Sequence, residues 1–289
     1  MNPISNPNSN PKSNQKQLSR CAQIERSITK KFRPSLWRPF VEGLKRYELI
    51  CEGDRIAVCI SGGKDSMLMA KLFQELTRHK KIPFEPVFLV MDPGYAPENR
   101  ALIEKNAKTM GIAITVFETD IFDSVANVPK SACYLCARMR RGHLYSQAKA
   151  LGCNKIALGH HYDDVIETIL MGMLWGAQVQ TMMPKLRSDN FEGMELIRPM
   201  YFVREADIKH FRDYHDLHFL QCACRFTDAC SVDGEMASKR TEVKQLIREL
   251  KKTNPGVEGH IFKSVENVHL GAVLAYKKDG KKVHFLDGY

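Results

Sequence analysis

Apolar stretches of strand length alternate with segments of helical periodicity over residues 55–175, and this alternation constrains the fold more than any other feature of the sequence. Strands separated by helices of this length pair in parallel, and helices then cover both faces of the sheet. Because such crossovers are right-handed, we expect an α/β fold with a doubly wound, mostly parallel sheet. The expected strands are 55–60, 84–92, 112–120 and 155–160, and the expected helices are 65–80, 97–111, 136–152 and 163–175.

The remaining sequence suggests four regions. Residues 1–20 are Asn, Ser, Pro and Lys with almost no large apolar side chain, which predicts a disordered basic tail. Residues 21–50 form a basic segment that should be helical, with breaks at Pro34 and Pro39. Residues 51–268 hold the main domain, which ends in a mostly helical part, and residues 269–289 form a tail or a hairpin around Lys-Asp-Gly-Lys. The expected later elements are a hairpin at 182–200 and helices at 204–217, 235–252 and 255–268.

The charge distribution indicates a polyanionic partner. The formal net charge is +10, and residues 1–50 contribute ten Lys and Arg against three Glu, which is +7 of that total. Nucleic acid is the obvious polyanion, although a basic tail can also serve solubility alone. The sequence has no secretory signal and no apolar run long enough for a membrane span, so we expect a cytoplasmic protein with no membrane contact.

The segment Ser-Gly-Gly-Lys-Asp-Ser follows the strand 55–60 directly and suits an anion. Gly62 and Gly63 allow a sharp turn that brings N–H groups close to a phosphate, and the next helix points its N-terminus there. Lys64 neutralises charge, and Ser61 and Ser66 can donate hydrogen bonds. The segment is not a Walker A loop, because Asp65 stands between Lys64 and Ser66. A carboxylate among phosphates repels them unless a cation lies between.

Two further segments fall on the same edge of the expected sheet. Met91 lies in Met-Asp-Pro-Gly-Tyr after the second strand. The segment Gly-His-His-Tyr-Asp-Asp follows the fourth strand and contains Gly159, His160, Asp163 and Asp164. His160 is well placed to touch a bound nucleotide. One of the two aspartates can serve only to cap the following helix, and the sequence does not decide which one.

The nine cysteines point to metal or sulfur chemistry rather than to disulfides. Cys133 and Cys136 form C-x-x-C at the start of a helix, and Cys222, Cys224 and Cys230 follow about 86 residues later. The residues alone leave open a redox pair, a four-thiol zinc site and an iron–sulfur cluster with three protein ligands. The other four cysteines are expected to be structural: Cys21, Cys51, Cys59 and Cys153.

The ordered set SGGKDS, MDPGY, CYLCARMRRGHLY, IALGHHYDD, MMPKL, IRPM and a distal cysteine resembles a known family over roughly residues 30–265. This family is the PP-loop (N-type) ATP pyrophosphatases, and the branch is the TtcA-like tRNA thiolases, which make 2-thiocytidine, with their thiouridine-forming relatives. The resemblance implies a sheet of the HUP, or adenine nucleotide α-hydrolase, type. It also implies that residues 51–268 are a PP-loop ATPase domain with an iron–sulfur site.

The resemblance further implies the roles of individual residues. Lys64, Asp65, Asp163 and Asp164 would be catalytic, and Asp65 would position Mg²⁺ on the departing pyrophosphate. A 4Fe–4S cluster would be held by Cys133, Cys136 and Cys222. Cys224 is an alternative ligand, because the distal site reads C-x-C where better-known members have C-x-x-C. The ATP-binding residues would be Ser61, Gly62, Gly63, Lys64, Asp65, Ser66, Met91, Gly159 and His160.

The expected reaction is ATP-dependent thiolation of tRNA. ATP would adenylate the C2 carbonyl oxygen of a cytidine, and sulfur would then be transferred through the cluster, with AMP and pyrophosphate as products. The expected tRNA-binding residues are Arg138, Arg140, Arg141, Lys30, Lys31 and Arg33, while Trp37 and Phe40 either stack on bases or pack into the body. A sulfur donor such as a cysteine desulfurase is implied, and a homodimer is left open.

Three alternative interpretations of the sequence differ in the reaction or in whether there is one. A uridine thiolase of the same family differs only in the target base. An amidating or lysidine-type PP-loop ligase with a structural metal would need no cysteine cluster, so the thiols argue against it. A non-catalytic nucleotide-binding regulator is disfavoured by the intact Lys64, Asp65 and Ser66.

Overall fold

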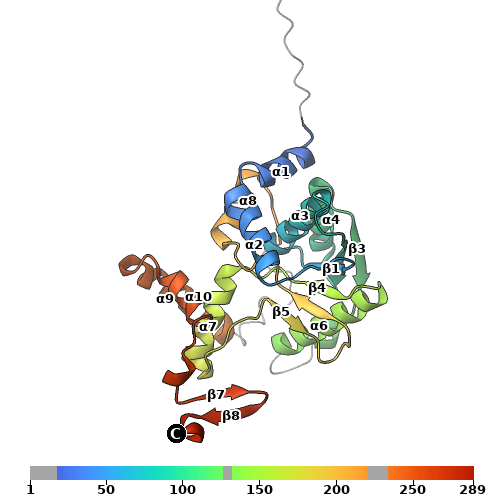
Figure 1. The fold of residues 1–289 in the computed structure, drawn as a ribbon. Helices are drawn as coiled ribbons and strands as arrows, with labels where there is room; N and C mark the ends of the chain where they lie inside the picture. The colour runs from blue at the N-terminus through green and yellow to red at the C-terminus, as the bar shows by residue number, and fades with distance from the viewer. Residues whose placement is uncertain (1–17, 126–131, 221–233) are drawn as a thin grey trace, which may run out of the picture.

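The computed structural model describes residues 18–125, 132–220 and 234–289, and it contains the expected parallel sheet (Figure 1). The six strands are in the order β3-β2-β1-β4-β6-β5. The parallel strands are β1 (Arg55–Ile60), β2 (Glu85–Asp92), β3 (Ile114–Glu118), β4 (Lys155–Ala157) and β6 (Glu195–Ile197). The short strand β5 (Lys185–Arg187) pairs antiparallel with β6 at the edge, which is the hairpin expected at 182–200. The predicted α/β fold class is confirmed.

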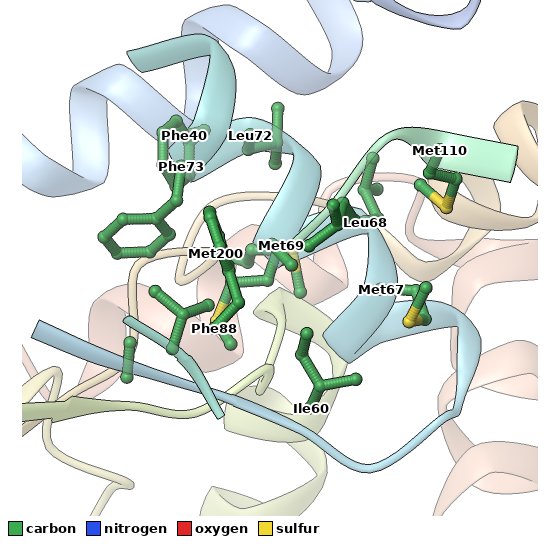
Figure 2. Close-up of a cluster of buried hydrophobic side chains, with 14 of the residues drawn as sticks. Phe40, Ile60, Met67, Leu68, Met69, Leu72, Phe73, Phe88, Met110 and Met200 are labelled. Atoms are coloured by element: carbon green, nitrogen blue, oxygen red, sulfur yellow. The ribbon is translucent and has the colours of Figure 1, made fainter. Parts of the chain in front are cut away.

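The apolar strand β1 lies at the centre, where helices cover both of its faces. Ile56, Val58 and Ile60 belong to a large cluster with the buried side of α3 (Lys64–Arg78), whereas Ala57 and Cys59 pack with α6 (Ala132–Ala150). Figure 2 shows the larger cluster, in which residues from distant helices meet above the sheet. Further helices of this layer are α1 (Arg20–Thr29), the π-helix η1 (Arg33–Trp37), α2 (Arg38–Arg46), α4 (Pro97–Met110) and α8 (Glu205–Tyr214).

A third cluster joins the helices that follow β4 and end the chain. It contains Val165 and Ile169 of α7 (Tyr162–Gly176), Val243 of α9 (Gly234–Thr253) and Phe262 of α10 (Val257–Ser264). Beyond these helices lie β7 (Ala275–Lys278) and β8 (Lys281–His284), which form the expected terminal hairpin, and two short 3-10 helices, η3 (Leu270–Ala272) and η4 (Phe285–Gly288). A short helix not expected from the sequence, α5 (Ile121–Val125), follows β3.

The N-terminal segment differs from the expectation in one detail. The helix is interrupted before Pro34, but Pro39 causes no break, since it is the second residue of α2, where no intrahelical N–H is needed. Trp37 and Phe40 are 6% and 0% exposed, so they pack into the body and are not available for base stacking. Ile24, Ile28 and Phe32 join the same core as α3. The proposed division into four regions stays a prediction, and residues 1–17 lie outside the described chain.

No helix in the described ranges is both long enough and apolar enough to cross a bilayer.

Candidate active site

The loop that joins β1 to α3 lies at the point where the strand order reverses. From β1 the chain goes to β2 on one side, and β4 on the other side continues to β6. Ligands of doubly wound sheets bind at this point, outside the carboxyl ends of the strands. Gly62 has φ +84°, and a Cβ there would lie 2.7 Å from Ile103 Cγ1. A Cβ on Gly159, after β4, would lie 3.1 Å from the backbone N of Ser66, so a side chain there would require the start of α3 to shift.

The two serines of the loop hold its turn together. The buried Ser66 Oγ accepts from the Ser61 N–H at 3.1 Å and donates to the Gly63 carbonyl at 3.0 Å. The Ser61 hydroxyl lies 3.1 Å from the Ser66 hydroxyl. Ser66 therefore shapes the loop from within and lines one adjoining cavity, while Ser61 lines two.

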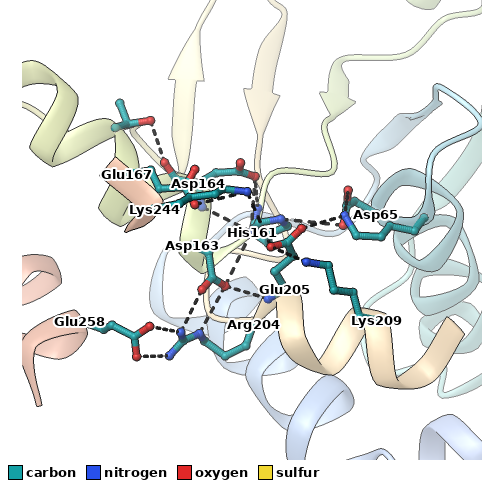
Figure 3. Close-up of polar contacts among 12 residues, drawn as sticks. Asp65, His161, Asp163, Asp164, Glu167, Arg204, Glu205, Lys209, Lys244 and Glu258 are labelled. Atoms are coloured by element: carbon teal, nitrogen blue, oxygen red, sulfur yellow. Dashed lines mark hydrogen bonds and ion pairs between the residues drawn. The ribbon is translucent and has the colours of Figure 1, made fainter. Parts of the chain in front are cut away.

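Lys64 and Asp65 form a charged centre at the start of α3. Figure 3 shows Asp65 beside His161. Lys64 Nζ lies 3.0 Å from Asp65 Oδ2 and 3.2 Å from Glu205 Oε1. Burial opposes the charged amine, but these two carboxylates outweigh it and raise the pKa of Lys64 above its ordinary value. Asp65 Oδ1 is buried without a hydrogen-bond partner, and the His161 ring Nε2 is 3.8 Å away. An unpartnered buried carboxylate oxygen is suited to a cation.

Two cavities meet at this centre, and Ser61 and Asp65 line both. The first, about 350 Å³, is walled by apolar side chains that include Met91 and Leu158, with Gly159 and His160 at its rim. The second, about 680 Å³, has a lining of mixed charge: the cations Lys64, Lys209 and Arg212 lie among the carboxylates of Glu205, Asp213 and Asp216. Most of the residues predicted to bind ATP thus lie together. Gly62 lines neither cavity, because Ile103 and Leu220 pack against it.

His160 is held as a neutral imidazole. Burial, aided by the positive charge of Arg198, lowers the pKa of His160 to about 4. The His160 Nδ1 atom is buried and has no hydrogen-bond partner in the protein. The residue is therefore an uncharged polar group in the lining of the smaller cavity.

The structure separates the two aspartates that the sequence left equivalent. Asp163 Oδ1 accepts from Arg204 Nη2 at 2.9 Å, and Asp163 Oδ2 accepts from the Glu205 N–H at 2.7 Å. Burial raises the pKa of Asp163, but these bonds outweigh it and hold the pKa below its ordinary value. Asp164 instead lines the smaller cavity and caps α7 by accepting from the His161 N–H at 3.1 Å.

Charged residues from α8 and α9, which sequence reasoning missed, complete the network (Figure 3). Glu205 lies 3.2, 3.1 and 3.7 Å from the amines of Lys64, Lys209 and Lys244, and despite burial these cations lower the pKa of Glu205 to about 2. Glu167, one turn beyond Asp163, is 3% exposed, and burial raises its pKa to about 7. Glu167 lies on α7 with Asp163, whereas Glu205, Lys209 and Lys244 follow no spacing motif, so only the packing of α8 and α9 brings those three residues here.

The structure describes only some of the cysteines that were predicted to bind a metal. Cys136 lies on α6 and packs beside the core cluster that includes Tyr95. The backbone of Cys133 is in the first turn of the same helix, while its side chain and the whole of Cys222, Cys224 and Cys230 lie outside the described part. Within that part, no three His, Cys, Asp or Glu residues are grouped to hold a metal. The last residue described before the gap is Leu220, whose N–H donates to the Gly62 carbonyl at 3.2 Å.

The predicted RNA-binding cations fall into two groups. On α6, Arg138 and Arg141 are exposed, whereas Arg140 turns toward the smaller cavity and lies 3.4 Å from the Tyr95 hydroxyl. At the N-terminus, Lys30, Lys31 and Arg33 are exposed. A separate groove of about 670 Å³ runs along α2 and the end of α3, and its cationic residues are Arg33, Arg38, Lys45, Arg46 and Lys81.

Comparisons with known proteins show the family to which this fold belongs. The PP-loop domain family matches residues 26–224. A tRNA-cytidine(32) 2-sulfurtransferase of Alcanivorax borkumensis is 34% identical over 250 residues, which cover 84% of each chain. The enzyme of the same name from Geobacter sulfurreducens is 35% identical over 225 residues, 77% of this chain and 85% of the relative. The U34-tRNA thiolase NcsA of Methanococcus maripaludis, solved with its 4Fe–4S cluster, has the same fold, with a TM-score of 0.60 at 21% identity, covering 79% of this chain and 76% of that one. The chain therefore belongs to the PP-loop domain family.

Proposed function

We propose that this protein is an ATP-dependent tRNA sulfurtransferase. It adenylates the C2 carbonyl oxygen of a cytidine in tRNA and replaces that oxygen with sulfur, releasing pyrophosphate and AMP. The observation that carries this proposal is the loop at the strand-order reversal, where Asp65, with its unpartnered carboxylate oxygen, lines two adjoining cavities and Lys64 lines the larger one. The extended similarity to enzymes named tRNA-cytidine(32) 2-sulfurtransferase supplies the substrate class and the base.

The two cavities suit the two ends of ATP. The smaller, apolar-walled cavity accommodates the nucleoside, with Met91 and Gly159 beside it and the neutral His160 as a polar contact. The larger cavity receives the β- and γ-phosphates that leave as pyrophosphate, on the side where Lys64 at the start of α3, Lys209 and Arg212 provide positive charge. Its carboxylates, Glu205, Asp213 and Asp216, require a cation beside the phosphates, in keeping with Mg²⁺. Asp65 lies between them, and its free Oδ1 is the group that would hold Mg²⁺. A bound Mg²⁺ would neutralise the charge of the departing pyrophosphate.

The two aspartates have different roles in this proposal. Asp164, on the cavity wall, is the one that faces ATP and orients the reacting groups. The carboxylate of Asp163 is already engaged by Arg204 and the Glu205 N–H, so it fixes α8 against α7. Glu205 in turn positions Lys64 and Lys209 at the pyrophosphate end of the site.

Three cysteines provide the sulfur-handling site. Cys133 and Cys136 are one turn apart on α6, and Cys222 follows Leu220, which contacts the phosphate loop, by two residues. Cys224 is the alternative third ligand. A 4Fe–4S cluster on three thiols supplies an open iron that can carry sulfur. A sulfur donor such as a cysteine desulfurase would reload it. The tRNA would lie along the exposed Arg138 and Arg141 and along the N-terminal cations Lys30, Lys31 and Arg33, in the cytoplasm.

The test measures two products on the same variants. Lys64→Ala should abolish tRNA-stimulated AMP formation while the iron content after anaerobic reconstitution stays unchanged, because Lys64 touches only the phosphate end. Cys136→Ala should abolish 2-thiocytidine, measured by nucleoside mass spectrometry, and reduce the iron content. Lys105→Ala, which removes an exposed lysine on α4, is the matched control. AMP formation that persists in Lys64→Ala contradicts the role of the loop, and 2-thiouridine as the product would select the uridine alternative.

A further inference from the structure

The last segment of the chain forms a hairpin that stands apart from the main sheet. β7 and β8 pair only with each other, and Figure 1 shows them outside the helices of the C-terminal part. Asp279 and Gly280 at the turn have φ of 51° and 75°. Positive φ at both central residues is the type I′ geometry that matches the twist of two antiparallel strands. The turn is thus well formed, but an isolated two-stranded hairpin is only marginally stable in water.

The strands of this hairpin place like charges directly opposite each other. Lys277 pairs with Lys282, and Lys278 pairs with Lys281. Because side chains alternate along a strand, one lysine pair lies on each face. All four residues are exposed, and none of the ion pairs found in the described chain includes them. Opposed like charges destabilise a strand pair. The free hairpin therefore carries a repulsion on both faces that its own surroundings do not offset.

We propose that this hairpin is a docking element for the phosphate backbone of tRNA. The inference rests on the proposed function, which makes tRNA the substrate. Closely spaced phosphates would neutralise both lysine pairs at once, so the repulsion in the free hairpin becomes attraction in the complex. The neighbouring rings of Phe285 and Tyr289 are 51% and 102% exposed and can stack on unpaired bases. The hairpin follows the helices packed on the ATP site, so it extends the tRNA surface beyond α6 and the N-terminal segment.

The experiment measures the affinity of the full-length protein for fluorescently labelled tRNA by anisotropy over a range of salt concentrations. In the variant Lys277→Gln/Lys278→Gln/Lys281→Gln/Lys282→Gln, Kd should rise on the order of tenfold or more at about 0.1 M salt. The slope of log Kd against log salt should fall by up to about 3, since each lost phosphate contact removes about 0.7–0.9. Glutamine is shorter than lysine by one atom but keeps a polar, uncharged side chain and relieves the repulsion, so the hairpin itself should persist. The control Lys105→Gln/Lys108→Gln on α4 should change Kd less than twofold.

Two results overturn the inference. If the unaltered protein binds tRNA and the hairpin variant has the same Kd and salt slope, the hairpin does not contact the backbone. If the variant changes the sedimentation coefficient of the protein without changing its tRNA affinity, the hairpin contacts a second copy of the chain instead. Absence of tRNA binding by the unaltered protein is a different outcome, which overturns the proposed function together with this inference.

Discussion

The separation of Asp163 from Asp164 leads to the sharpest prediction. Asp163→Asn keeps one acceptor oxygen but places an amide N–H₂ toward Arg204, so the ion pair and one hydrogen bond are lost. Hydrogen bonds to charged groups contribute about 1.5–3 kcal/mol each. Arg204 still donates to Glu258 at 2.6 Å in this variant, so its guanidinium is not left unpaired. The free energy of unfolding should therefore fall by less than it does when a buried ion pair loses one partner completely. We expect a loss of about 2–3 kcal/mol, or roughly 3–5 °C in Tm for a chain of this size.

Asp164→Asn should behave in the opposite way. The asparagine oxygen can still accept from the His161 N–H, and the lost partner, Arg240 at 3.2 Å, is 41% exposed and therefore screened. Stability should change by less than about 1 kcal/mol. ATP turnover should fall about 100-fold or more, because the variant removes a carboxylate that faces the nucleotide in the proposed site.

Both variants are measured by thermal unfolding followed by circular dichroism and by AMP formation at 20 °C with saturating ATP and tRNA.

The pH dependence of stability provides a second check. The pKa of Asp163 is lowered below 3.8 in the folded protein, so its contribution is present above about pH 4 and is lost as pH falls through the lowered value. The stability gap between the unaltered protein and Asp163→Asn should therefore narrow only in acid. An Asp163→Asn variant with unchanged Tm and no AMP formation would refute this assignment.

Three further predictions concern residues around the site. Gly159→Ala should reduce ATP turnover at least tenfold, because the new Cβ would meet the backbone of Ser66 at 3.1 Å and displace the start of α3; turnover equal to that of the unaltered protein would show that the loop yields without loss. Glu167→Gln should remove the decline in stability between pH 4.5 and 7, where the carboxyl ionises in the unfolded chain but stays protonated in the fold; denaturant titrations at several pH values can measure this, and an identical pH profile would contradict the raised pKa of Glu167. Lys71→Ala should lower the free energy of unfolding by about 3–5 kcal/mol, because Lys71 is 0% exposed and pairs with Glu25 at 2.7 Å, while AMP formation at 20 °C should persist.

The order of strands and helices along the chain, and the position of the loop between β1 and α3, were predictable from the sequence. β1 is apolar at every position that the structure buries. Most of the buried residues of α3 are likewise apolar, so the sequence pattern predicts which face of this helix is buried. Glycine at 62 is likewise a local requirement, since its φ of +84° is one that other residues rarely adopt. Errors at element ends, such as β4 stopping at Ala157, arise because side chains of the following loop are also partly buried.

The charged network could not be predicted, because it joins residues far apart in the chain. Lys64 and Glu205 are brought together by the packing of α8 on α3. No sequence pattern in either segment predicts this contact. The aromatic residues of the N-terminal segment give a second example. Trp37 and Phe40 stand among cations, a pattern that suits RNA, but the π-helical turn and α2 direct both rings into the core.

The sequence alone therefore determined the sheet, the loop and the chemical types available at its edge, since strand and helix periodicity and glycine conformations depend on neighbouring residues. The tertiary structure decided which side chain faces which partner. Asp163 and Asp164 are adjacent at the start of one helix, about 100° apart around its axis, so each points to a different neighbour. Arg204, the N-cap residue of α8, binds the carboxylate of Asp163, whereas Asp164 lines the cavity beside β4.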